Sequence, residues 1–268
     1  MNDTIVKASH NTGACYGIEK CAEVVFEHGL MVKEEGLEIL EQRMQSLDPS
    51  SHDTYKFLGV EQADGIQKEK VLQRVKAEMQ VRLKKLLQLE LYDGNLIRAT
   101  NRKVIPVAAY PMNVCRFSMN DVNELDMIVK RELRSCNMLG RQSSDERLYL
   151  SRNIGGRGLI LLRDVYGETK VRVACYMAKS TSKWIRTAWE RECASQYCSI
   201  RRDAEVVLRE IGCVLEFRGN EIVCDGECLA ADWKKCWKRL KQLLKKKTVT
   251  KRVSEYKLKE MQSEIFKG

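Results

Sequence analysis

The chain has 268 residues, with 47 Lys and Arg against 37 Asp and Glu, and its formal net charge at pH 7 is +10. Hydrophobic residues make up 44% of the sequence, which supports a core and excludes a wholly disordered chain. Only 3 Pro and 16 Gly are present, which favours long helices over a turn-rich sandwich or barrel. No apolar run approaches the roughly 20 residues that span a bilayer, and no signal peptide is recognisable. We therefore expect an intracellular protein, nuclear or cytoplasmic, without a membrane span.

The charge is unevenly distributed along the chain. Residues 1–60 hold 5 basic and 10 acidic side chains, residues 61–170 hold 20 and 14, and residues 171–268 hold 22 and 13. The densest basic stretch, Lys234–Arg252, has ten basic residues and no acidic one. Such a surface indicates an acidic polymer as partner. The alternative interpretation is a solvated helix face.

The first expected elements are short strands, over Ala22–Phe26 and Tyr55–Val60, with a turn at Glu27–Gly29. From Ile66 onward the apolar residues repeat every three or four positions, which predicts a helix that stops before Asp93. The residues that carry this period are Leu72, Val75, Met79, Leu83 and Leu86.

Ser118 and Asp121 have the spacing of a capping box and predict the start of another helix. The sequence predicts helices over residues 164–211, and we expect Trp184 and Trp189 to lie on one side of a helix. Two short apolar segments around Gly219-Asn220 predict a hairpin. Trp233, Trp237, Leu240 and Leu244 then mark the apolar face of a last, very basic helix. The predicted fold class is α+β and mostly helical, with a small antiparallel β element near the N-terminus and one hairpin in the helical C-terminal region.

An ordered set of short motifs resembles the reverse transcriptases of LINE-type non-LTR retrotransposons. The similarity covers roughly residues 16–165. The matching segments are Tyr16–Ala22, Tyr55–Val60 with Ala63-Asp64, Ile97–Ala99 with Asn101, Ile105–Val107 with Tyr110, Glu124–Asp126, and Arg147–Arg152 with Gly155–Leu159. Each motif is weak alone, and their order gives the resemblance its weight.

The resemblance implies three domains. Residues 1–60 would be the end of the palm, residues 61–145 a helical thumb, and residues 146–268 a basic, mostly helical C-terminal region. Fingers and most of the palm would lie upstream, and a polypeptide that supplies them is an expected partner.

The resemblance also assigns roles to two short segments. The turn Lys56, Phe57, Leu58 and Gly59 matches the primer grip, which holds the 3′ end of the growing strand. Lys20 matches a lysine that such polymerases are thought to use as a general acid toward pyrophosphate. The alternative for Lys20 is an ordinary surface lysine that caps a strand.

Polymerase chemistry needs carboxylates that hold two Mg²⁺ ions, and reverse transcriptases supply them partly through an Asp-Asp turn. The sequence has no Asp-Asp pair, and too little chain precedes Tyr16 to hold that turn. We therefore expect this chain by itself to be inactive and to hold no cofactor, because Mg²⁺ would belong to the missing catalytic half.

A polymerase thumb grips a duplex through its phosphates, which requires Lys and Arg on helix faces. We expect non-specific binding of RNA or an RNA–DNA hybrid. One alternative is a non-enzymatic interaction protein whose basic amphipathic helices bind a protein or an anionic surface; another is a decayed reading frame. The residues expected to contact a backbone are Lys84, Lys85, Arg98, Arg102, Lys103, Arg157, Lys234, Lys235, Lys238 and Arg239.

The sequence has eleven cysteines, an odd number without an export signal, which indicates reduced thiols. The six in the C-terminal region have irregular spacings with no CxxC pair, and no histidine lies nearby. Zn²⁺ prefers paired ligands at short spacings, so we expect buried or partly buried thiols, and a structural zinc site is the less favoured alternative. The six are Cys193, Cys198, Cys213, Cys224, Cys228 and Cys236.

Overall fold

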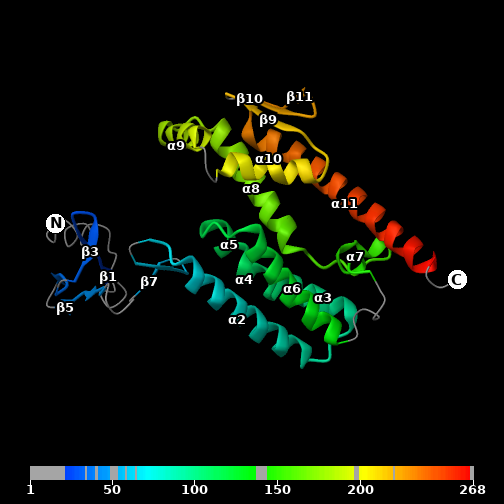
Figure 1. Cartoon of the computed structure of the whole chain (residues 1–268), viewed down its shortest axis with the longest axis horizontal. Helices are drawn as coiled ribbons and strands as arrows, with labels where there is room; N and C mark the ends of the chain where they lie inside the picture. Colours follow the sequence, from blue (N-terminus) through cyan, green and yellow to red (C-terminus); the bar gives the residue numbers. More distant parts are fainter. Residues whose placement is uncertain are drawn as a thin grey trace. The chain divides into compact units, whose positions relative to one another are not determined.

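A computed structural model of the chain describes residues 22–33, 35–39, 42–48, 54–57, 59–63, 65–136, 144–195, 199–219 and 221–265 (Figure 1). The chain divides into two compact units, residues 1–73 and residues 74–268. The mostly helical α+β class is confirmed, with small antiparallel sheets and a C-terminal hairpin. Among the described helices, none combines the length and the apolar character that crossing a bilayer requires.

The described part of the first unit consists of short strands. Strands β2–β3, β4–β5 and β7–β8 pair as antiparallel hairpins, and β1 pairs with β6 in parallel. The bounds are β1 Ala22–Glu23, β2 Val25–Glu27, β3 Leu30–Val32, β4 Glu38–Ile39, β5 Gln42–Arg43, β6 Gln45–Ser46, β7 Tyr55–Phe57 and β8 Val60–Gln62.

Both single strands predicted in this unit are divided in the structure. The segment Ala22–Phe26 is shared between β1 and β2, which have different partners. The structure has two strands, β7 and β8, where the sequence predicted a single strand over Tyr55–Val60. The chain reverses at Gly59, whose φ is +81°, a value that glycine adopts without a steric penalty. The expected turn after the first strands is present at His28-Gly29, between β2 and β3.

Helices form most of the second unit, and α2 begins just before it. Their bounds are α2 Lys68–Leu87, α3 Asp93–Lys103, α4 Ile105–Ala109, α5 Pro111–Val114, α6 Met119–Ser135, α7 Glu146–Tyr149, α8 Leu162–Lys179, α9 Lys183–Ala194, α10 Ile200–Glu210 and α11 Trp233–Ile265. The C-terminal sheet has the order β11–β10–β9, with β9 Leu215–Arg218, β10 Glu221–Cys224 and β11 Glu227–Cys228.

Local signals fixed several of these elements as expected. The capping box is present, because the Ser118 hydroxyl accepts from the Asp121 N–H and the Asp121 carboxylate accepts from the Ser118 N–H. In the second unit, the apolar stripe of α2 is buried at Val75, Met79 and Leu83. The three helices over residues 162–210 and the β9–β10 hairpin are likewise confirmed.

Helix α8 lies at the centre of the second unit and contacts α4, α5, α6, α9, α10, α11 and β10. Its closest neighbour is α10, because a Cβ on Gly167 would lie 2.7 Å from Cγ1 of Val207. The buried ammonium of Lys170 lies 3.0 Å from the Asp203 carboxylate and over the ring of Tyr166. Glycine therefore allows the two helices to approach, and an ion pair compensates the one charge that α8 buries.

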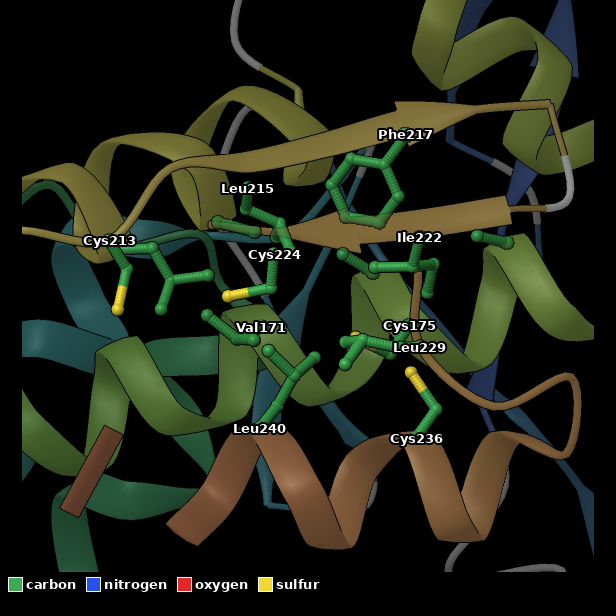
Figure 2. Packing of buried hydrophobic residues seen from close by; sticks show 14 of the residues in the cluster. Val171, Cys175, Cys213, Leu215, Phe217, Ile222, Cys224, Leu229, Cys236 and Leu240 are labelled. Carbon is green, nitrogen blue, oxygen red and sulfur yellow. The ribbon is translucent and has the colours of Figure 1, made fainter. Parts of the chain in front are cut away.

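The C-terminal part of α8 belongs to a hydrophobic cluster shared with α10, α11 and the hairpin. Figure 2 shows Phe217 and Ile222 of the hairpin pointing toward α8, while Leu240 and Cys236 of α11 point up toward it from the other side. Leu240 is fully buried. These contacts hold the long helix α11 against the rest of the unit.

Leu240→Ala should lower the free energy of unfolding by about 2–5 kcal/mol, because truncating a buried leucine leaves a cavity. Leu258→Ala, on the same helix at a side chain that is 59% exposed, is the matched control and should change it by less than about 0.5 kcal/mol. Urea unfolding measures both. Equal losses in the two variants would contradict the docking of α11 through Leu240.

The N-terminus of α8 is capped by a side chain from another helix. Its own N-cap residue, Leu161, makes no side-chain cap bond. Instead, the carboxylate of Asp126 on α6 accepts from the N–H groups of Leu162 and Arg163, at 2.7 and 3.0 Å. Burial of this carboxylate raises the pKa of Asp126 to about 6, against the lowering effect of the two backbone donors.

Because the pKa of Asp126 is higher in the folded than in the unfolded chain, folding favours its protonated form. Its contribution to stability is therefore full below about pH 4 and is lost as the pH rises through about 6. Between pH 4 and pH 7 we expect the free energy of unfolding of the wild type to fall by about 2 kcal/mol. The Asp126→Asn variant should not show this fall. Parallel urea titrations across this range measure the difference, and identical pH profiles would contradict it.

Candidate nucleic-acid interface

The most basic surface of the described chain lies on α11. Local signals start this helix, since the Asp232 carboxylate accepts from the Lys235 N–H at 2.9 Å in the manner of an N-cap. Lysine, leucine and glutamine, which favour helix, make up most of its first half. Cys236, Leu240 and Leu244 recur every four residues and are buried, so they share one face. Lysine side chains occupy the opposite face.

Several cations of α11 are neutralised by carboxylates from other elements. Lys247 lies 2.7 Å from Asp225, Lys241 lies 2.7 Å from Glu168 of α8, and Arg239 lies 2.8 Å from Glu227 of β11. Further pairs and contacts join Arg252 to Asp164 and the ring of Tyr149, Lys251 to the Glu210 carbonyl, and Lys259 to Glu146. These groups fasten the helix and are poorly placed to receive a ligand.

A second group of α11 cations is exposed and carries no partner. Positions 234, 238 and 245 fall close together on a helical projection, and positions 235 and 246 fall beside them. All five side chains are exposed, and within the described ranges none makes an ion pair or a side-chain hydrogen bond. We call this group the lysine face: Lys234, Lys235, Lys238, Lys245 and Lys246.

The cations predicted on α2 and α3 are also exposed. They are Lys84 and Lys85 near the end of α2, and Arg98, Arg102 and Lys103 on α3. None of these five side chains has an ion-pair partner in the part of the chain that the structure describes. Two of the ten residues predicted to contact a nucleic-acid backbone form ion pairs within the protein instead. Arg157 pairs with Asp93, and Arg239 pairs with Glu227.

Arg157 belongs to a loop whose glycines allow tight packing. Asn101 of α3 holds this loop by donating to the Gly158 carbonyl and accepting from the Ile160 N–H, both at 2.9 Å. A Cβ on Gly156 would lie 1.9 Å from the Leu150 carbonyl oxygen. Asp93, at the start of α3, accepts from the guanidinium of Arg157. The loop is thus a packing element that joins α3 to the segment before α8.

The segment that resembles a primer grip is only partly described. Lys56 is exposed on β7, Phe57 is its last residue, and Gly59 forms the turn to β8. Lys20 and Leu58 lie outside the described residues. The roles assigned to these residues by resemblance stay predictions.

Four cysteines meet in the core as two pairs, a proximity that their sequence spacing did not indicate. Cys175 and Cys236 are hydrogen-bonded to each other and fully buried. The ligand atoms of Cys213, Cys224 and Asp225 all lie within 4.8 Å of one another.

The contacts around the second pair favour a structural role. Burial raises the pKa of Cys224 to about 12. The Lys247 ammonium donates to Asp225 and to the Gly212 carbonyl, and its hydrogen bond lowers the pKa of Asp225. The carboxylate that would complete a metal site is thus already neutralised.

Comparison of the chain with protein-family models, with curated proteins and with solved structures finds no match in any of the three. The function of the chain therefore has to be argued from the surface described above.

Proposed function

We propose that the chain binds the phosphate backbone of RNA or of an RNA–DNA hybrid, without sequence preference, through the lysine face of α11. The observation that carries the proposal is the exposure of five lysines, without an ion-pair partner among the residues that the structure describes, on one side of a helix whose other side is buried. Such a row matches the repeated negative charges of a phosphate backbone, and counterion release on binding favours association.

The unpaired cations of α2 and α3 support a second region of backbone contact in the same unit. Arg98 and Arg102 are one helical turn apart on α3, and both are exposed. Contacts of this kind position a nucleic acid and carry no base information. They fit the proposed descent from the palm end, thumb and following region of a LINE-type reverse transcriptase, whose thumb grips a duplex in this manner.

This proposal places the site of action inside the cell, in the nucleus or the cytoplasm, where RNA and RNA–DNA hybrids occur. A polypeptide that supplies polymerase fingers and the catalytic part of a palm would be a natural partner under the same proposal, and the Mg²⁺ ions of polymerisation would then belong to that partner.

The test is binding of a labelled RNA–DNA hybrid across a salt series. The triple variant Lys234→Gln, Lys238→Gln and Lys245→Gln should weaken binding and flatten the slope of log K against log salt by about 2–3, because each lost phosphate contact removes about 0.7–0.9. Glutamine keeps a high helix propensity, so the fold should persist, which circular dichroism checks.

The matched control removes three cations that are already ion-paired: Arg218→Gln, Arg239→Gln and Lys241→Gln. It changes the net charge by the same amount and should leave the salt slope within about 1 of the wild type, since these charges are neutralised locally. Equal effects of the two triple variants would overturn the assignment to the lysine face.

A binding affinity that depends neither on polymer length nor on salt concentration would favour the alternative function, that of an interaction protein. A third triple variant, at Arg98, Arg102 and Lys103, measures in the same assay what α3 contributes. We expect a flattening of similar size if the duplex reaches the thumb-like helices.

A further inference from the structure

The surface of α9 carries an aromatic side chain that packing does not explain. The indole of Trp184 is 83% exposed, although tryptophan is highly buried on average in folded proteins. Trp189, five residues later, is buried and lies edge-on to Phe217 with ring centroids 5.1 Å apart. The two tryptophans therefore point to different sides of α9, and the prediction that they share one side is wrong.

Trp184 borders a shallow hollow at the junction of α8 and α9. Thr187 and Ala188 lie about one turn beyond it on the same helix, Arg191 lies a further turn on, and Met177 of α8 adds to the lining. Thr187 and Ala188 are short and exposed, so they leave the face of the indole open. The hollow has room for a flat group laid against that face.

The charges around the hollow favour an anionic ligand. Arg191 lines the hollow, is exposed and has no ion-pair partner among the described residues. The carboxylate of Glu192 is already used, since it accepts from Arg116 at 3.0 Å and from the Ile200 N–H at 2.9 Å. Lys183 and Glu190 lie roughly a third of a turn from Trp184 around the helix and Arg186 lies almost half a turn away, so none of the three is on the side of α9 that carries the hollow.

We propose that Trp184 is a stacking platform for an unpaired base of single-stranded nucleic acid, with a neighbouring phosphate met by Arg191. Aromatic side chains beside cations are the means by which proteins hold single strands without reading sequence, because every base offers a flat π face. This inference rests on the proposed function and adds to it a second contact, to bases, on an element other than α11.

The experiment compares two probes of equal length, an oligothymidylate and an abasic oligonucleotide, against the full chain. Trp184→Ala should weaken binding of the oligothymidylate roughly tenfold and leave binding of the abasic strand unchanged. Trp184→Phe should keep part of the preference for bases. Oligothymidylate should also quench the tryptophan fluorescence of the wild type more than that of Trp184→Phe.

Tyr92→Ala is the matched control, since Tyr92 is 88% exposed and lies at the start of α3, away from this hollow in sequence. It should not alter the preference for bases. Because Trp184 is so exposed, its variants should keep the thermal stability of the wild type, which a melting curve checks.

The failures of the two proposals are distinguishable. If Trp184→Ala leaves the oligothymidylate affinity intact while the α11 variant still flattens the salt slope, the platform is overturned and the proposed function stands. If the wild type binds neither probe nor the hybrid, the proposed function fails and the platform with it. Concentration-dependent self-association that Trp184→Ala abolishes, without any base preference, would assign the hollow to a second copy of the chain and overturn the inference.

Discussion

The burial of α8 is the constraint on which the rest of the second unit depends. A helix surrounded on so many sides needs short side chains at its closest crossing and compensation for each polar group it buries. Gly167 meets the first need against Val207, and Asp203 meets the second for Lys170. At its N-terminus the free N–H groups are satisfied by Asp126, which comes from α6 and not from the adjoining residues. The helix is thus stabilised by groups distant in sequence, and the hairpin and α11 pack on a frame that is already complete.

Helix α11 shows how one residue type acquires two roles. Its lysines and arginines look alike in sequence, yet those near the hairpin, α8 and α10 meet carboxylates or carbonyls and fasten the helix. The lysine face extends from the opposite side, where no partner is within reach among the described residues. A helix held this firmly by one face keeps its remaining charges at fixed spacing. That is the property that a phosphate-binding surface needs, and it connects the core of the unit to the function proposed for it.

The elements that the sequence predicted correctly are those set by local interactions. The stripe of α2, the capping box of α6 and the β9–β10 hairpin each depend on residues within a few positions of one another. The prediction of a single strand over Tyr55–Val60 failed because an apolar pattern does not show where a glycine turns the chain. The prediction that Trp184 and Trp189 lie on one side of the helix failed because residues five positions apart are separated by well over one full turn. For the candidate site, the basic stretch of α11 was visible in the sequence, whereas the exposure of Trp184 was not.

The sequence by itself determined the net charge, the concentration of lysine in the last helix and the periodicity that buries Leu240 and Leu244. Only the tertiary structure decided which of the cations remain available. Arg157 and Arg239 are neutralised by Asp93 and Glu227, residues that lie 64 and 12 positions away in the chain, while Lys234 and Lys238 are not. The physical reason is that an ion pair depends on the distance between two charges in space. That distance is fixed by how the helices pack, and not by the order of the residues.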